Sequence, residues 1–124
     1  MKVIVSNQSE LPIYVQIKEQ IKEQIMNGTI PEGETLPSIR QLAKNLGISV
    51  ITTTRAYSEL EQEGFIAARQ GKGSVVLPRD NEMVREQYLK RIEQAFETAI
   101  ENARYAQIQN EELVNILEAL LHEE

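Results

Sequence analysis

The sequence predicts a mainly helical α+β fold, with three helices and a β-hairpin in an N-terminal domain and two helices in a C-terminal tail. Three observations support this prediction. Apolar residues recur at helical spacing in several separate segments. Two of the expected helices are joined by a short turn at Gly47, and residues 65–77 hold two β-prone segments around a glycine-rich turn. We expect the boundary at Pro78, with one domain over residues 1–78 and a helical tail over residues 79–124.

The first expected helix begins at Pro12, because proline is well suited to the first turn of a helix. It ends at Gly28, since glycine readily ends a helix. Between them lies one apolar stripe at helical spacing, made of Ile13, Ile17, Ile21 and Ile25. We expect residues 3–5 to form a short strand before this helix, and residues 31–34 to form a loop after it.

Local signals also predict the next two helices. Ser38, followed three residues later by Gln41, is a capping box that opens a short helix running to Leu46. Gly47 can adopt the left-handed conformation that ends it. Ser49 caps a third helix, about residues 49–63, whose inward side chains are Ala56, Tyr57 and Leu60. Two helices joined by a tight turn that contains glycine predict a helix-turn-helix.

Residues 65–77 follow as a β-hairpin. Its strands are expected over residues 65–69 and 74–77, around the turn residues Gln70, Gly71, Lys72 and Gly73. A hairpin placed directly after a helix-turn-helix forms a wing, so the N-terminal domain is expected to be a winged helix-turn-helix.

The tail is expected to hold two helices and to form a homodimer. The first, about residues 80–108, carries a coiled-coil-like apolar stripe, namely Leu89, Ile92, Phe96, Ala99, Ala103 and Ala106. Asn110 is expected to cap the second. Two helices alone can hide only part of this apolar surface, so the remainder predicts an interface between two copies. Its expected residues are Leu89, Ile92, Phe96, Ile100, Leu113, Ile116, Leu117, Leu120 and Leu121.

The net charge of −6 lies entirely in the tail. Residues 1–78 hold eight basic and eight acidic side chains, whereas residues 79–124 hold five basic and eleven acidic ones. Residues 36–58 and 64–78 contain basic side chains and no acidic one. Attraction to DNA depends on the local field at the contact face, so the acidic total does not exclude a nucleic-acid partner.

Two features of the N-terminal domain suit DNA. The second helix of a helix-turn-helix enters the major groove, and here residues 50–54 are all β-branched, an unusual choice for the start of a helix. Methyl and hydroxyl groups of such residues suit thymine methyls and phosphates. Arg40, Arg69 and Lys72 suit phosphate or guanine. The alternatives are that Val50 or Ile51 belongs to the core and that the basic side chains are only solvated.

Other function classes have little support in the sequence. There is no cysteine and only one histidine, His122, so neither a thiolate zinc site nor a histidine-centred acid–base pair is expected. Glu93, Glu97 and Glu101 lie at helical spacing, but such a stripe is usually a solvated face rather than a metal site. No secretory signal and no membrane-spanning segment is apparent. We therefore expect a cytoplasmic protein that is not an enzyme and needs no metal or cofactor.

Five groups of residues carry a resemblance to a known family: Pro12-Ile13-Tyr14 with Gln16-Ile17, Leu36-Pro37-Ser38 with Arg40 and Leu42-Ala43, Gly47-Ile48-Ser49, Ala56-Tyr57 with Leu60-Glu61 and Gly64-Phe65-Ile66, and Gln70-Gly71-Lys72-Gly73. Over about residues 11–78 the chain resembles the GntR family of bacterial regulators, and its short tail resembles the YtrA subfamily. The resemblance implies contacts with DNA from Arg40, from the start of the 49–58 helix, and from Arg69 and Gly71. Many relatives have arginine where this chain has Val50, so a guanidinium contact with guanine is not available there.

Together, the residue patterns and the resemblance predict a transcription factor that binds an inverted-repeat operator in double-stranded DNA as a homodimer. The sequence does not decide between repressor and activator, but repression is favoured because the chain has room for little beyond DNA binding and dimerisation. The alternative is a module that binds only other proteins, for which the tail alone would suffice. No effector can be named from the sequence. The residues expected to bind DNA are Ser38, Arg40, Ser49, Val50, Ile51, Thr52, Thr54, Arg55, Tyr57, Arg69, Gln70, Gly71, Lys72 and Gly73.

Overall fold

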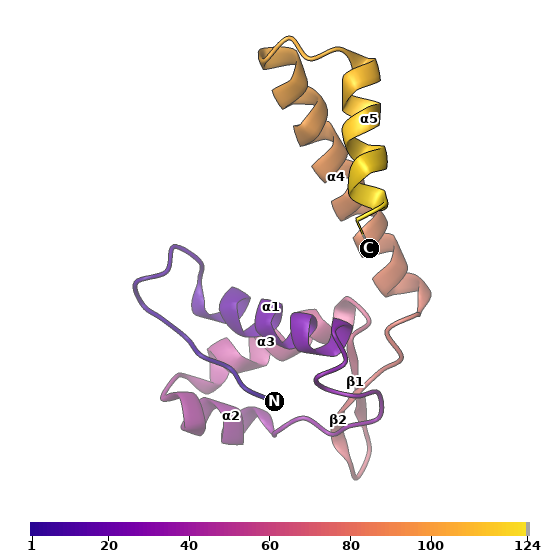
Figure 1. The fold of residues 1–124 in the computed structure, drawn as a ribbon. Helices are drawn as coiled ribbons and strands as arrows, with labels where there is room; N and C mark the ends of the chain where they lie inside the picture. The colour runs from indigo at the N-terminus through magenta and orange to yellow at the C-terminus, as the bar shows by residue number, and fades with distance from the viewer. Residues whose placement is uncertain (124) are drawn as a thin grey trace. The chain divides into compact units, whose positions relative to one another are not determined.

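A computed structural model describes residues 1–123, and the chain divides into two compact units, Met1–Arg85 and Glu86–Glu124 (Figure 1). The first unit holds three helices and a two-stranded antiparallel sheet, and the second holds most of α4 and all of α5. The elements are α1 (Ile13–Met26), α2 (Ile39–Leu46), α3 (Val50–Gln62), β1 (Ile66–Arg69), β2 (Gly73–Val76), α4 (Glu82–Tyr105) and α5 (Asn110–Leu121). Three helices followed by a hairpin confirm the predicted winged helix-turn-helix within a mainly helical α+β chain.

The core of the first unit forms where α1 packs against α3. The apolar stripe of α1 is buried at Ile17, Ile21 and Ile25. On α3 the buried face includes Ala56 and Leu60. Side chains from α2, the sheet, the connecting segments and the first turn of α4 close the core, namely Ile30, Leu36, Leu42, Ala43, Phe65, Ile66, Val76 and Val84.

The predicted caps set the ends of α2 and the start of α3. The Ser38 hydroxyl accepts a hydrogen bond from the Gln41 amide at 3.1 Å, and Ser49 accepts one from the Thr52 amide at 3.1 Å. Gly47 ends α2 with φ 66° and ψ 36°, the left-handed conformation that glycine adopts at least cost. The reciprocal half of the capping box, a hydrogen bond from the Ser38 amide to the Gln41 side-chain oxygen, does not form within residues 1–123, and the Gln41 side-chain nitrogen donates to Asn45 Oδ1.

The wing is a hairpin supported by the segment that follows α1. Its strands pair from Ile66 with Val76 to Arg69 with Gly73, so residues 70–72 form the turn. β1 is one residue shorter than predicted, since Phe65 lies outside it, and β2 is shifted by one residue, so that it includes Gly73 and not Leu77. Thr35 forms a bridge with Val75, a pairing that was not predicted. The Glu61 carboxylate accepts a hydrogen bond from the Ala68 amide at 2.9 Å and ties the wing to α3.

Residues 3–5 are extended, but the predicted strand does not form. Alternate backbone groups pair instead with three glutamine side chains of α1, which we call the glutamine ladder. Lys2 pairs with Gln24, Ile4 with Gln20 and Ser6 with Gln16, each through one N–H and one carbonyl at 2.6–3.0 Å. A carboxamide has the same donor and acceptor as a peptide group, so it can replace a neighbouring strand. In Figure 1, the chain runs along this segment and then turns back into α1.

The tail helices differ in two details from the prediction. Asn81 Oδ1 accepts a hydrogen bond from the Val84 amide at 3.1 Å and caps α4, which runs from Glu82 to Tyr105 and is shorter than the expected 80–108. Asn110 is not a cap: it is the first residue of α5, and Gln109 occupies the cap position without a side-chain hydrogen bond. α5 runs back beside α4 (Figure 1). None of the helices in residues 1–123 is long and apolar enough to cross a membrane.

The glutamine ladder gives a first prediction. Replacing Gln20 by alanine removes both hydrogen bonds to Ile4, each of which contributes about 1 kcal/mol. Because the N-terminal segment opens separately from the core, the loss of about 2 kcal/mol should make the Ile4 amide exchange about thirtyfold faster, while the unfolding temperature changes little. Hydrogen exchange followed by NMR measures this. The control is Gln62→Ala, at an exposed position of α3. Equal protection of the Ile4 amide from exchange in both variants would contradict the ladder.

Candidate nucleic-acid interface

The exposed face of α3 begins with two large apolar side chains. Ile51 is 83% exposed and Val50 is 48% exposed, so neither belongs to the core. The opposite face is buried at Thr53, whose hydroxyl donates to the Ser49 carbonyl at 3.1 Å. An isoleucine this exposed at the start of a helix costs solvation free energy unless it meets a partner. Thymine methyl groups in a major groove are a partner of the right chemistry.

Exposed basic side chains also lie on α2 and on the second turn of α3. Arg40 is exposed on the first turn of α2, and Lys44 on its last turn. Thr54 and Arg55 are exposed on the second turn of α3, and Thr52 is half-buried. The capping serines Ser38 and Ser49 are exposed as well, at the N-termini of α2 and α3. Free amide groups at helix N-termini attract phosphate.

The turn of the wing is equally open. Arg69, Gln70, Gly71, Lys72 and Gly73 are all exposed. The turn is closed by a hydrogen bond from the Lys72 amide to the Arg69 carbonyl at 3.0 Å. Gly71 has φ 77°, a value that favours glycine, and a Cβ there would meet nothing within 4 Å. The glycine is thus required by the turn, and the space beside it leaves room for a close approach by a partner.

Tyr57 is the one residue of the expected DNA-binding set that the structure buries. It is 3% exposed, and its hydroxyl donates to the Pro37 carbonyl at 2.7 Å. Burial raises the pKa of Tyr57 to about 12, so the phenol stays neutral. Tyr57 therefore links α3 to the segment before α2 and does not present its ring or hydroxyl to a partner. The prediction that Tyr57 points inward with Ala56 and Leu60 is confirmed, and the expected DNA contact from Tyr57 is wrong.

A second polar surface joins α1 to α3 and was not predicted. Tyr14, Lys18 and Lys22 lie at intervals of four along α1, and the same intervals separate Arg55 and Glu59 on α3 from Glu63, which directly follows α3. We call these six residues the α1–α3 seam. Lys18 donates to Glu59 at 2.9 Å and to Glu63 at 3.0 Å, and Lys22 donates to Glu63 at 2.8 Å. The Arg55 guanidinium lies over the Tyr14 ring, 3.8 Å from its centroid.

The ion pairs of the seam shift the ionisation of its members. Hydrogen bonding to Lys18 lowers the pKa of Glu59. Burial alone would raise the pKa of Glu63, but the hydrogen bonds from Lys22 and Lys18 outweigh it, and the pKa is lowered. Burial likewise opposes the charge of Lys18, yet Glu59 and Glu63 together raise its pKa. All three groups are therefore held in their charged forms near neutral pH.

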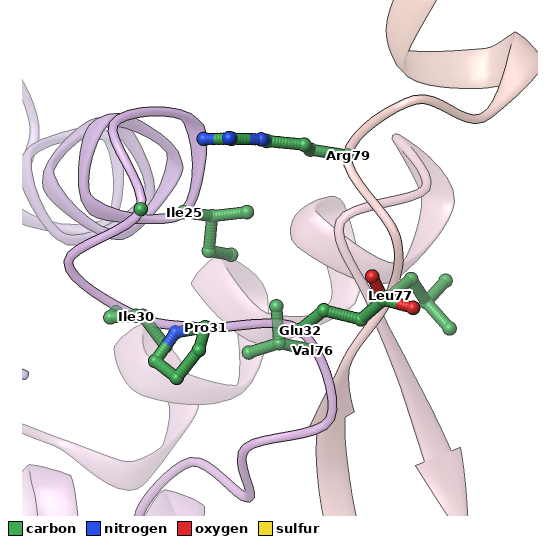
Figure 2. A pocket seen from close by; sticks show the side chains of 8 residues that line it. Ile25, Ile30, Pro31, Glu32, Val76, Leu77 and Arg79 are labelled. Atoms are coloured by element: carbon green, nitrogen blue, oxygen red, sulfur yellow. The ribbon is translucent and has the colours of Figure 1, made fainter.

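The first unit also contains a cavity of about 290 Å³ beside the C-terminal end of α1 (Figure 2). Figure 2 shows Arg79 reaching across from the segment after β2, where its Nη1 donates to the Met26 carbonyl at 2.6 Å. The remaining lining residues are Ile25, Gly28, Ile30, Pro31, Glu32, Val76 and Leu77. This hydrogen bond joins the segment between β2 and α4 to the C-terminal end of α1. Within residues 1–123, no three His, Cys, Asp or Glu side chains gather as a metal site would require.

The second unit exposes most of the apolar residues expected at a dimer interface. Phe96 is 48% exposed, Ile100 40% and Leu117 38%, and α5 contains no buried residue at all. Leu113 is half-buried. A groove of about 350 Å³ lies between α4 and α5 and is lined only by apolar side chains, namely Phe96, Ala99, Ile100, Leu113, Val114, Ile116, Leu117 and Leu120. Leu89, Ile92, Leu120 and Leu121 are exposed as well.

Comparison with known sequences places this architecture among regulators. The bacterial regulatory proteins of the gntR family match residues 13–76. The chain is 34% identical over 105 residues to the HTH-type transcriptional repressor YtrA of Bacillus subtilis (strain 168), a match that covers 85% of this chain and 81% of YtrA. It is 43% identical over 72 residues to the HTH-type transcriptional repressor NagR of the same strain, but this match spans only 30% of NagR.

Comparison with solved structures also finds transcription regulators. YtrA from Sulfolobus acidocaldarius, a GntR-family transcription factor, superposes with a TM-score of 0.64 at 32% identity and covers 99% of this chain and 97% of that one. AraR(DBD), solved in complex with operator ORX1, superposes with a TM-score of 0.53 at 29% identity and covers 61% of this chain and 95% of that one.

The seam gives a prediction about acid stability. Because the pKa values of Glu59 and Glu63 are lowered in the folded protein, their contribution is present above the usual value of 4.5 and is lost as the pH falls through the folded values. Glu63→Gln should unfold more easily at pH 7, by roughly 1 kcal/mol, and should lose less stability between pH 6 and pH 3 than the native chain. Urea titration at each pH measures both. Glu23→Gln, exposed on α1, is the control, and parallel pH curves for Glu63→Gln and the native chain would contradict the assignment.

Proposed function

Because the chain belongs to the GntR family of bacterial regulatory proteins, and is thereby a DNA-binding transcriptional regulator rather than an enzyme, we propose that it represses transcription by binding an inverted-repeat operator as a homodimer. In this proposal the N-terminal part of α3 enters the major groove, and the wing lies on the adjacent groove. The observation that carries it is the exposed start of α3, where Ile51 and Val50 have no partner in the protein's core.

Side-chain chemistry decides which of these residues would contact base edges and which would contact phosphates. Val50, Ile51 and Thr54 offer methyl and hydroxyl groups to base edges. Arg40 and Arg69 lie on α2 and at the end of β1, so they meet the phosphates on either side. Ser38, Ser49, Thr52 and Arg55, together with turn residues Gln70, Gly71, Lys72 and Gly73, complete the proposed contact surface, from which Tyr57 is removed.

The homodimer is supported by the surface of the second unit. A monomer in water would expose the whole stripe from Leu89 to Ile100 on α4 and most of α5. Monomeric proteins rarely expose a continuous apolar surface of this kind. A twofold arrangement hides the same stripe on both copies at once, and it matches the symmetry of an inverted repeat.

Repression is the simplest output of such a chain. The two described units offer a DNA-binding surface and an apolar helical surface. A dimer that occupies a promoter blocks transcription without any further activity. The relatives YtrA and NagR carry the word repressor in their names, which favours the same output here.

The proposed phosphate contacts predict how binding depends on salt. Arg40→Ala and Arg69→Ala should each weaken binding to every DNA sequence and reduce the slope of log K against log salt concentration by about 0.9. Fluorescence anisotropy with operator and random duplexes over a salt series measures this. Lys90→Ala removes an exposed positive charge from α4 and should leave the slope unchanged. A native slope in both arginine variants would remove them from the interface.

The proposed dimer predicts the effect of one charge on the tail. Phe96→Glu places a carboxylate in the apolar groove and should convert the dimer to a monomer. Operator binding should then weaken by at least tenfold, because the second copy no longer raises the local concentration of a DNA-binding domain. Light scattering and DNA titration measure the two effects. Gln94→Glu adds the same charge at an exposed position of α4 outside the groove, and a monomeric native protein with tight operator binding would refute the dimer.

A further inference from the structure

Arg55 is held on α3 by side chains that are not expected to touch DNA. Its Nε lies 3.3 Å from Glu59 Oε2, and its guanidinium covers the face of the Tyr14 ring at 3.8 Å. The other oxygen of Glu59 accepts a hydrogen bond from Lys18 at 2.9 Å. Arg55 is therefore the exposed end of a chain of contacts that begins inside the α1–α3 seam.

The remaining donors of this guanidinium point to a further partner. The side chain of Arg55 is 61% exposed, and its two η nitrogens contact no acceptor within residues 1–123. A guanidinium presents its η amino groups as a planar fork that matches a phosphate. Arg55 lies on the same turn of α3 as Thr54, one turn beyond Ile51, so the fork stands beside the proposed base-reading residues.

We propose that Tyr14 and Glu59 are positioning residues for Arg55, which they hold with its η amino groups ready to bind a DNA phosphate. This inference rests on the proposed function, and it adds two residues that make no DNA contact themselves. Tyr14 fixes the plane of the guanidinium by stacking. Glu59 fixes its rotation by accepting the Nε–H, and Lys18 fixes Glu59 in turn.

Positioning Arg55 should strengthen its binding to phosphate, because an arginine side chain is otherwise conformationally free. A free arginine side chain populates many rotamers and loses them when it binds. If most of that freedom is already lost in the unbound protein, more of the interaction with phosphate appears as affinity. Preorganisation by Tyr14 therefore strengthens binding without adding a contact.

A competing interpretation is that Glu59 masks the charge of Arg55 and opposes DNA binding. The geometry favours positioning, because Glu59 is shared with Lys18 and meets Arg55 only through Nε. The ring of Tyr14 also carries no charge and cannot mask one. The two interpretations predict opposite effects when the Glu59 carboxylate is removed, since masking would be relieved and positioning would be lost.

The test is a double-mutant cycle on the full chain, with operator DNA and a random duplex. Arg55→Ala should weaken binding to both DNAs about tenfold and lower the salt slope by about 0.9. Tyr14→Leu should weaken binding three- to fivefold in the native background and have no effect in the Arg55→Ala background. Tyr14→Phe keeps the ring and should bind as the native protein does. If Tyr14→Leu does not fold, judged by circular dichroism, Tyr14→Met replaces it.

A second readout follows Arg55 in the unbound protein. The Nε–H signal of Arg55, assigned by its absence in Arg55→Lys, should show restricted motion by NMR relaxation. That restriction should be lost in Tyr14→Leu and kept in Tyr14→Phe.

The outcomes distinguish a failure of this inference about Arg55 from a failure of the proposed DNA interface. Native affinity of Arg55→Ala would overturn the inference alone, because Arg40 and Arg69 test the interface independently. Additive effects of Tyr14→Leu and Arg55→Ala would show that Tyr14 does not act through Arg55. A loss in Tyr14→Phe as large as in Tyr14→Leu would assign the effect to the hydroxyl. Tighter binding by Glu59→Ala would favour masking by Glu59.

Discussion

The packing of α1 against α3 in one fixed register is the constraint on which the rest of the first unit depends. Three stripes at intervals of four residues run along α1, and each meets a different neighbour. The isoleucines enter the core, the stripe that begins at Tyr14 meets α3, and the glutamines bind the N-terminal segment. Residues 14, 18 and 22 face residues 55, 59 and 63, so a shift by one turn would separate Arg55 from the Tyr14 ring and leave only one of the two lysines opposite a glutamate.

This register also determines what α3 presents to solvent. Glu59 lies on α3 and Glu63 directly after it, and if they were unpaired their charges would repel the phosphate that the other face of α3 is proposed to approach. Lys18 and Lys22 neutralise them on the side that faces α1. The acidic side chains of α3 thus strengthen its packing and do not weaken the field at its exposed start.

Local signals allowed much of the fold to be predicted, and non-local pairing explains what was missed. Ser38, Ser49 and Gly47 act within four residues of their own positions, so the sequence suffices to place them. Val50 and Ile51 could not be assigned to core or surface, since their run is too short to show a period. The Thr35 bridge and the glutamine ladder join segments distant in sequence and leave no periodic trace. The equal spacing of Lys18, Lys22, Glu59 and Glu63 was a visible signal for the seam, yet such stripes are usually solvated.

The glutamine ladder limits its own length, because it matches two different repeats. Four residues of α-helix advance about 6.0 Å, whereas two residues of extended chain advance about 6.6 Å. The mismatch grows by roughly 0.6 Å at each step, so three rungs tolerate it and a long ladder would drift out of hydrogen-bonding distance. Only the even-numbered residues Lys2, Ile4 and Ser6 pair their backbone groups with the glutamines. A single inserted residue between Lys2 and Ser6 would turn the paired peptide groups away from α1, whereas an insertion of two would keep them facing it.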